Sequence, residues 1–411
     1  MKRILFAVIL VFALLASSCA TRPEPQDNTS STVSEEQEQT GVFGKPAPSP
    51  LDINSGEFKK ASEIDSNYIV KSENGYTYIS IFAPEIDISG FPYLEENGNQ
   101  LYRLKIADQS KYTDMNKNLA WNTAGGQVRF RTNATNLKID VTLHYSYAGM
   151  KHFAPSGISG MDVYVGTGTA RKYVTTILPT QEPKYSGDVV LEAGTKEVLI
   201  NLPLYAGVKE MSIGLPSDAT IAQPLPRAYD KPIVFYGSSI TQGGCASRPG
   251  TAYFNILSRA LDAGVVNLGF SGSAFGETAI AEYIALIEMS AFVFDYDYNA
   301  DTPEKLGPTH YPFYEIVRNA HPDIPIIFVS RCSYNPKDPN AVQCRKLIMN
   351  NYEKAKAAGD DNVYFVDGSL FFDPDNPNDY TVDGLHPTDL GFRAMAEGIF
   401  PVLKAALEKN G

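Results

Sequence analysis

The strongest constraint on the fold is an alternation of short apolar runs and helix-like segments in the second half of the chain. The runs are nearly all apolar, and they read IVFY (from residue 233), VVNLGF, AFVFDYD, PIIFVS and VYFVDG. Helical periodicity separates them, as in TAYFNILSRALDAG, where Gly264 is the expected stop. Strands that are apolar on both faces are typical of a parallel sheet covered by helices on both sides. Residues 230–411 therefore predict an α/β domain with a doubly wound, three-layer parallel sheet.

The first half of the chain predicts a different kind of sheet. Between residues 51 and 225 the chain has short β-like runs with period two, shown by apolar Leu137, Ile139 and Val141 with polar residues between them. Glycine, asparagine and proline separate these runs, and no long helical stretch intervenes. This pattern predicts an all-β sandwich or jelly roll. The proline-rich segment near 222–232 predicts the boundary between the two domains.

The N-terminus has the pattern of an export signal. Two basic residues precede an apolar run over residues 4–15, which is shorter than the ~20 residues that span a bilayer. The small residues before Cys19 resemble the lipobox of bacterial lipoproteins. This resemblance implies cleavage before Cys19 and lipidation of that residue; ordinary cleavage after Ala20, without an anchor, is the alternative.

We therefore expect a lipoprotein signal peptide over residues 1–18 and a flexible tether over residues 19–50. The tether is rich in Pro, Ser, Thr, Glu and Gln and has few apolar residues to bury. The protein would be exported and lipid-anchored to the bacterial cell envelope, at the outer membrane or cell surface, with the periplasm as the alternative. Membrane contact would occur only through this anchor.

Composition argues against several partners. The formal net charge of −12 disfavours nucleic acid, and no glycine-rich phosphate loop with GK[ST] is present. The histidines are not clustered along the chain, and we interpret His144 and His152 as structural or surface residues. Asp295 and Asp297 alternate on one strand and should face opposite sides. We therefore predict no metal and no cofactor.

The cysteines leave their redox state open. Besides Cys19 there are Cys245, Cys332 and Cys344, which cannot all pair with one another. One disulfide with one free thiol and three free thiols are both possible. No pair has the spacing of a zinc knuckle or a redox CxxC motif. The oligomeric state also stays open.

Residues that could take part in catalysis lie where the predicted strands end. Ser239 follows the first strand in the turn GSSI, Gly272 follows the second, and Asn299 follows the third. Asp383 and His386 lie past the fifth strand in DGLHP. Ligands of open parallel sheets bind beyond the carboxyl ends of the strands. The five residues should therefore meet at one edge of the sheet.

These blocks resemble those of the SGNH, or GDSL-type, hydrolases over roughly residues 230–408. The resemblance implies a flavodoxin-like SGNH domain with Ser239 as nucleophile, His386 as base and Asp383 as its partner. It also implies an oxyanion hole made by Ser239, Gly272 and Asn299. Ser238 stands where the family usually has aspartate, and the third block lacks the usual Gly-x-Asn-Asp.

The chemistry of these residue types agrees with such roles. A serine hydroxyl is a poor nucleophile until a base takes its proton, and a carboxylate holds an imidazole base in the useful tautomer. Fixed hydrogen-bond donors then stabilise the negative charge of the tetrahedral intermediate.

The first domain carries a second resemblance. Residues 160–164, Gly-Met-Asp-Val-Tyr, resemble the Gly-x-Asp-Leu-Tyr signature of a domain that precedes some bacterial SGNH hydrolases. Some carbohydrate esterases also have a jelly roll before the SGNH domain, which implies an acylated carbohydrate substrate. Asp162 is interpreted either as an interface or turn residue or as a substrate contact. Trp121 either packs in the core, the commoner fate, or stacks on a sugar ring.

The expected function is that of an exported serine esterase. It would remove O-acyl groups, acetyl first among them, from a polysaccharide or oligosaccharide. A lipid or thioester hydrolase of the same class and an inactive, glycan-binding hydrolase fold are the alternatives.

Overall fold

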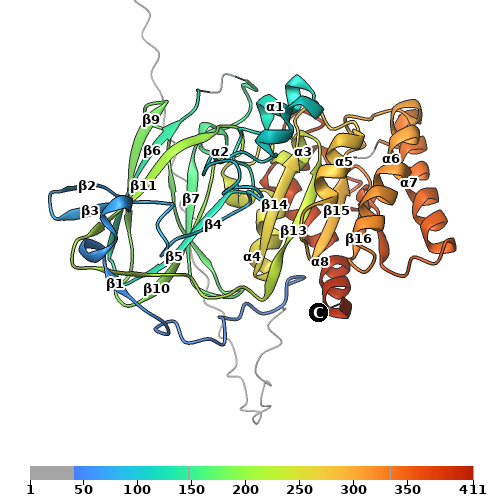
Figure 1. Cartoon of the computed structure of the whole chain (residues 1–411). Helices are drawn as coiled ribbons and strands as arrows, with labels where there is room; N and C mark the ends of the chain where they lie inside the picture. The colour runs from blue at the N-terminus through green and yellow to red at the C-terminus, as the bar shows by residue number, and fades with distance from the viewer. Residues whose placement is uncertain (1–40, 147–148, 334, 411) are drawn as a thin grey trace, which may run out of the picture. The chain divides into compact units, whose positions relative to one another are not determined.

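The computed structural model describes residues 41–146, 149–333 and 335–410 (Figure 1). The expected signal peptide, Cys19 and residues 19–40 of the expected tether lie outside these ranges. Among the residues that are described, none of the helices has the length and hydropathy needed to span a bilayer.

Two antiparallel sheets form the first half of the described chain, as the period-two pattern predicts. Leu137, Ile139, Val141 and Leu143 on β6 are buried, whereas the residues between them are partly exposed. One sheet has the strand order β1-β12-β5-β10-β7-β8, with β4 also paired to β5, and the other has the order β2-β3-β11-β6-β9. The bounds in the first sheet are β1 (Lys59–Lys60), β12 (Thr220–Ala222), β5 (Gln127–Thr132), β10 (Lys196–Asn201), β7 (Met161–Val165), β8 (Lys172–Ile177) and β4 (Asp87–Ser89). Those in the second are β2 (Ile69–Glu73), β3 (Tyr76–Ser80), β11 (Val208–Pro216), β6 (Asn136–Leu143) and β9 (Lys184–Val190). The predicted β-sandwich is confirmed.

A parallel sheet follows in the second half. Its order is β14-β13-β15-β16-β17, the doubly wound order in which the first strand of the domain lies second from one edge. The strands are β13 (Tyr229–Gly237), β14 (Ala263–Gly269), β15 (Ala291–Asp295), β16 (Ile326–Val329) and β17 (Val363–Val366). Buried residues fill both faces, because Ile233 and Phe235 pack on one side and Val234 and Tyr236 on the other.

Helices cover both faces of this sheet and complete the predicted three layers (Figure 1). On one face lie α4 (Tyr253–Leu261) and α8 (Asp389–Asn410), and on the other lie α5 (Thr278–Ala285), α6 (Pro303–Ala320) and α7 (Pro339–Ala357). The short helices are α1 (Asp114–Leu119), α2 (Pro155–Ile158), α3 (Ser239–Gln242) and 3-10 turns at Ala61–Glu63, Ser66–Tyr68, Ile106–Lys111, Pro249–Thr251, Gly368–Leu370 and Pro377–Tyr380. The predicted α/β fold class is therefore confirmed.

One predicted helix end is wrong by three residues. The sequence predicts that the helix before β14 stops at Gly264, but α4 ends at Leu261 and Asp262 is its C-cap, with a left-handed φ of 50°. Aspartate tolerates this region better than most residues because its side chain can bond locally. Here the carboxylate accepts hydrogen bonds from Arg171 Nη1 (2.6 Å) and Ala228 N–H (3.2 Å).

Asp162 of the Gly-x-Asp signature lies where the sandwich meets the α/β domain. Its fully buried carboxylate accepts hydrogen bonds from Gly250 N–H (2.7 Å) and Arg248 Nη1 (2.6 Å) across the interface, and from Asn201 Nδ2 (2.8 Å) on β10. A Cβ at Gly250 would lie 2.5 Å from the same carboxylate, so only glycine fits. Of the two interpretations of Asp162, the structure favours the interface residue.

A buried arginine makes a second contact across the interface. The guanidinium of Arg103 donates to the carbonyl oxygens of Asn267 (2.9 Å) and Gly269 (2.8 Å) on β14, and to that of Leu119 (2.7 Å). Burial lowers the pKa of Arg103 to about 10, so it stays charged at neutral pH. These bonds fix the carboxyl end of β14, from which the Gly272 loop departs.

Replacing Asp162 should destabilise the whole fold. Asp162→Ala removes the ionic partner of Arg248, which keeps only its bond to the Tyr164 hydroxyl, and leaves Gly250 N–H without an acceptor. Breaking a buried pair in this way costs about 3–5 kcal/mol. Urea unfolding followed by circular dichroism measures the loss. Asp188→Ala is the matched control, since Asp188 forms an exposed pair with Lys138 and should leave the midpoint almost unchanged. Equal midpoints for both variants would contradict the role of Asp162.

Candidate active site

Ser239 lies in a tight turn between strand β13 and helix α3. The strand ends at Gly237, and Ser238 is the N-cap residue of α3, its Oγ accepting from Ile240 N–H at 3.2 Å. A Cβ at Gly237 would lie 1.8 Å from the carbonyl oxygen of Asp295, so the turn requires glycine there. Ser238 thus supplies the cap in place of the usual aspartate, because a cap needs only an oxygen acceptor.

The structure brings the predicted serine, histidine and aspartate together in one line of hydrogen bonds. Ser239 Oγ lies 3.0 Å from His386 Nε2, and His386 Nδ1 lies 2.8 Å from Asp383 Oδ2. Asp383 Oδ1 accepts from the backbone N–H groups of Leu385 (3.0 Å) and His386 (2.7 Å). The side chains of His386 and Asp383 keep 12% and 29% of their surface exposed, so a substrate can reach them.

The environment of Asp383 favours its ionised form. Partial burial by itself would raise the pKa of the carboxyl group, but the hydrogen bonds from the His386 ring and from the backbone of His386 and Leu385 outweigh it. The pKa of Asp383 therefore lies below its ordinary value, and the carboxylate can stabilise an imidazolium at neutral pH.

The two other predicted residues lie on the loops that follow β14 and β15. Gly272 is exposed with φ at +66°, and its N–H donates no hydrogen bond within the described part of the chain. Asn299 Oδ1 accepts from Ala274 N–H at 3.1 Å, which ties the two loops together. The Gly272 loop is also held to the serine turn, because Gln242 Oε1 accepts from Ser271 N–H at 3.0 Å.

The sandwich domain supports the serine turn directly. Tyr205 donates its hydroxyl hydrogen to the carbonyl oxygen of Ser239 (3.2 Å), and Gln242 Nε2 donates to the carbonyl oxygen of Leu204 (3.2 Å). Trp121 packs against the rings of Tyr102 and His144, each with a centroid distance of 4.6 Å. This contact agrees with the commoner interpretation of Trp121 as a packing residue.

His152 is a site residue that the sequence analysis did not find. It precedes α2 in the sandwich domain, yet its Nε2 lies 3.3 Å from Asp383 Oδ2 and its ring centroid 6.1 Å from that of His386. Its side chain is 42% exposed. The only signal in the sequence was a histidine in a turn-rich segment just before the Gly-x-Asp signature, and such a histidine is usually structural.

Cys245 also faces this site. The structure has Cys245, Cys332 and Cys344 as free, buried thiols, so it favours three free thiols over the disulfide. Ligand atoms of Cys245, His152 and His386 all lie within 4.8 Å of one another. The fold thus brings together two histidines that are distant in the sequence, His152 and His386.

Two buried carboxyl groups lie behind the serine turn. Asp295 Oδ2 accepts from Thr241 Oγ1 at 3.4 Å, whereas Asp297 Oδ2 pairs with Arg331 Nε at 3.2 Å. The expectation that the two residues face opposite sides is wrong, because residues two apart on a strand share a face, and Asp297 lies beyond the end of β15 at Asp295. Burial, and then the nearby charge of Asp297, raise the pKa of Asp295 to about 8.

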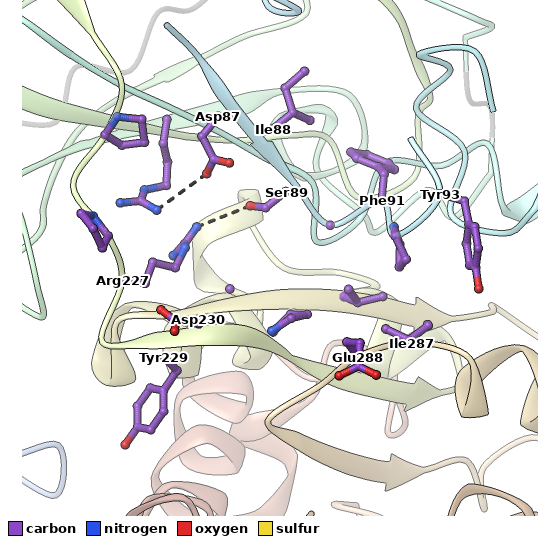
Figure 2. A pocket seen from close by; sticks show the side chains of 18 of the residues that line it. Asp87, Ile88, Ser89, Phe91, Tyr93, Arg227, Tyr229, Asp230, Ile287 and Glu288 are labelled. Carbon is purple, nitrogen blue, oxygen red and sulfur yellow. Dashed lines mark hydrogen bonds and ion pairs between the residues drawn. The ribbon is translucent and has the colours of Figure 1, made fainter. Parts of the chain in front are cut away.

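A large cavity of about 830 Å³ lies away from these residues (Figure 2). Figure 2 shows Asp87 and Ser89 of β4 on one wall and Glu288 on the opposite wall. Arg227, which bonds Ser89, and Pro232 near the start of β13 also line the cavity. Arg227 already donates to Gln127 Oε1 and to the carbonyl oxygen of Ala263. None of the predicted site residues lines this cavity. We therefore identify the candidate site by the hydrogen-bonded Ser239, His386 and Asp383, and not by the volume of a cavity.

Comparisons with known proteins agree with this geometry. Residues 230–404 match the GDSL-like lipase/acylhydrolase family, and residues 76–221 match the GxDLY domain, the N-terminus of SGNH-hydrolase-type esterases. A crystal structure from Bacteroides ovatus, described as a GDSL-like lipase, is 30% identical with a TM-score of 0.73, covering 81% of this chain and 98% of that one. The chain belongs to the GDSL-like lipase/acylhydrolase family. No curated protein matches this hydrolase.

More distant structures share the fold of this GDSL-family hydrolase. The salicylyl-acyltransferase SsfX3 of a tetracycline biosynthetic pathway is 20% identical with a TM-score of 0.67, and a family two carbohydrate esterase from Cellvibrio japonicus is 14% identical with a TM-score of 0.54. Both comparisons cover 81% of this chain and 98% of the other. At these identities the likeness concerns the fold alone.

The buried carboxyl group of Asp295 should make the stability depend on pH. In the unfolded chain Asp295 ionises near pH 4, but in the folded protein it keeps its proton up to about pH 8. Its contribution is therefore most favourable below pH 4 and falls between pH 4 and 8, by at most about 1.4 kcal/mol per pH unit. Asparagine cannot ionise, so Asp295→Asn should gain stability relative to the wild type over this range.

Urea unfolding at pH 5, 6, 7 and 8 measures the difference between the two proteins. Asp188→Asn serves as the exposed control and should follow the wild-type curve. A constant difference between Asp295→Asn and wild type across these pH values would contradict the raised pKa.

Proposed function

We propose that this hydrolase is an exported serine esterase that removes O-acyl groups, acetate first among them, from a polysaccharide or oligosaccharide. The observation that carries the proposal is the hydrogen-bonded line Ser239–His386–Asp383, with distances of 3.0 and 2.8 Å. A serine, an imidazole and a carboxylate in this order are the parts of an acyl-transfer site.

The first half of the reaction transfers the acyl group to the enzyme. Ser239 Oγ attacks the ester carbonyl carbon while His386 Nε2 takes the hydroxyl proton, and Asp383 stabilises the imidazolium. The tetrahedral intermediate then collapses and the C–O bond to the sugar breaks. His386 gives its proton to the leaving sugar oxygen, so a free carbohydrate hydroxyl departs and an acyl-Ser239 ester remains.

The second half uses water. His386 Nε2 takes a proton from a water molecule that attacks the acyl-Ser239 carbonyl carbon. The second tetrahedral intermediate breaks its bond to Ser239 Oγ, which recovers a proton from His386. A carboxylic acid leaves, and the free enzyme is restored.

The oxyanion hole is assigned to Ser239 N–H, Gly272 N–H and the Asn299 amide. Gly272 supports this role because its N–H is free of hydrogen bonds within the described residues, and its exposed, side-chain-free backbone lets a substrate approach. Asn299 supports it because Ala274 N–H occupies Oδ1 and so turns Nδ2, the donor, the other way. Donors fixed in advance stabilise the oxyanion without reorganisation during the reaction.

Several observations support a carbohydrate substrate. A family two carbohydrate esterase from Clostridium thermocellum, solved in complex with cellohexaose, shares the fold with a TM-score of 0.51 at 15% identity, covering 69% of this chain and 93% of that one. An acetyl xylan esterase from Butyrivibrio proteoclasticus has a TM-score of 0.51 at 12% identity. In this chain Phe275, three residues beyond Gly272, is 41% exposed and offers an aromatic face of the kind on which sugar rings stack.

The proposal includes export and a lipid anchor on Cys19. It rests on the sequence of residues 1–19 alone, where the charged start, the apolar run and the small residues before Cys19 follow the lipoprotein pattern. The acidic, proline-rich segment that follows would hold the esterase away from the membrane.

Replacing Ser239 should abolish hydrolysis. Ser239→Ala removes the nucleophile, so the release of acetate from p-nitrophenyl acetate should fall about 10³-fold or more, and Asp383→Asn should cost a similar order by leaving the imidazole in the wrong tautomer. Ser186→Ala, on β9 of the sandwich, is the matched control. A fluorophosphonate probe should label the wild type and Ser186→Ala but not Ser239→Ala. An unlabelled wild type would point instead to an inactive, glycan-binding fold.

The substrate class is tested by acetate release from acetylated xylan, mannan and pectin and by a series of p-nitrophenyl esters of increasing chain length. We expect acetate release from at least one polysaccharide and the highest kcat/KM for the shortest acyl chains. A preference for long chains would identify a lipid hydrolase instead.

A further inference from the structure

Three side chains of metal-binding type converge beside the serine from three separate segments. His152 comes from the sandwich domain, Cys245 follows α3, and His386 precedes α8; their ligand atoms lie within 4.8 Å of one another. A thiolate with two imidazoles is a ligand set that Zn²⁺ favours, in sites that keep the fourth position for water.

We propose that Zn²⁺ binds His152, Cys245 and His386 and switches the hydrolase off. The site itself follows from the three side chains and their spacing. The inhibition rests on the proposed esterase function, because it requires that His386 act as the base.

The geometry allows such a site with a small movement. Tetrahedral zinc with Zn–N bonds of about 2.0 Å and Zn–S bonds of about 2.3 Å places its ligand atoms roughly 3.3–3.6 Å apart. The three atoms must therefore close in by about 1 Å from the outer limit of their present spacing. His152 can supply this movement, since its side chain is 42% exposed and lies in a loop before α2.

Cys245 has a backbone conformation that is unusual for a residue other than glycine. Its φ of +74° lies in the left-handed region that favours glycine, and the two preceding residues, Gly243 and Gly244, show that the turn accepts glycine readily. The chain nevertheless has a side chain there, and that side chain is 7% exposed and faces the site. Backbone outliers of this kind concentrate at functional sites.

The nearby charges suit a divalent cation. Asp383 Oδ2 lies 2.8 Å from His386 Nδ1 and 3.3 Å from His152 Nε2, and a carboxylate behind a histidine orients it and raises its basicity as a ligand. Burial raises the pKa of the Cys245 thiol to about 12, so the metal-free site holds a neutral thiol. Metal binding displaces the thiol proton into water, and the thiolate and Asp383 together then balance the charge of Zn²⁺.

Coordination would block catalysis through His386. If Nε2 binds the metal, Ser239 loses its base; if Nδ1 binds it, the ring loses Asp383. In either arrangement the imidazole can no longer carry a proton between the serine and the leaving group. Because His152 belongs to the sandwich domain, the first domain would take part in this control.

Binding is tested without any need for activity. Co²⁺, a spectroscopic substitute for Zn²⁺, is titrated into the full chain carrying Ser239→Ala and no polyhistidine tag. We expect a thiolate-to-cobalt charge-transfer band and the intense visible bands of tetrahedral cobalt, both displaced by Zn²⁺. Adding Cys245→Ser should remove the charge-transfer band and His152→Gln should weaken cobalt binding at least tenfold, whereas Cys344→Ser, which changes another buried free cysteine, should leave the spectrum unchanged.

Inhibition is tested on the chain with Ser239 intact, by titrating Zn²⁺ against p-nitrophenyl acetate hydrolysis and then adding EDTA. Each variant is compared with its own metal-free rate. We expect reversible loss of activity, with the half-inhibiting Zn²⁺ concentration raised at least tenfold by Cys245→Ser and by His152→Gln but unchanged by His144→Gln, a sandwich histidine outside the cluster.

The possible results test the metal site, the inhibition by Zn²⁺ and the proposed esterase function separately. If the charge-transfer band does not form, or survives Cys245→Ser, the metal site is overturned. If the band forms but Zn²⁺ leaves hydrolysis unchanged, the control of activity is overturned. If the band forms and the metal-free chain hydrolyses no ester, the proposed function fails while the metal site stands.

Discussion

A single buried carboxylate, that of Asp162, anchors the contacts that lead from the sandwich domain to His386. It holds Gly250 and Arg248 of the loop beyond the serine turn, at 2.7 and 2.6 Å. The same loop is bonded to Asp389, whose carboxylate accepts from Ser247 N–H (2.9 Å) and Thr251 Oγ1 (2.8 Å). Asp389 begins α8, three residues after His386. The signature aspartate of the first domain therefore fixes the loop on which the His386 segment rests.

The site is consequently built by both domains. The α/β domain supplies Ser239, Asp383 and His386. Tyr205, which bonds the carbonyl oxygen of Ser239, and His152, which approaches Asp383, belong to the sandwich. Asp162 of the sandwich likewise pairs with Arg248 of the α/β domain. Both domains therefore contribute contacts to the candidate site.

The sequence predicted the residues whose position follows from topology. Ser239, Gly272 and Asn299 each follow a strand of a parallel sheet, and the carboxyl ends of such strands meet at one edge, so the order of apolar runs was enough to assign all three to that edge. His152 and Cys245 could not be predicted in this way. His152 reaches the site only because the two domains pack as they do, and Cys245 faces it because of a left-handed backbone that no periodicity reveals. The end of α4 was missed for a related reason, since Arg171 from the sandwich stabilises the left-handed Asp262.

The substitution of serine for the usual aspartate at residue 238 makes physical sense in this setting. Ser238 is fully buried, and two buried carboxyl groups lie at the end of the neighbouring strand β15 (Asp295) and just beyond it (Asp297). Only Asp297 has an arginine partner, and burial keeps Asp295 largely protonated, with its pKa raised to about 8. An aspartate at residue 238 would bury one more carboxyl group, at a cost in desolvation. A hydroxyl satisfies the N-terminus of α3 equally well without adding charge, so the serine turn keeps its geometry while its surroundings stay close to neutral.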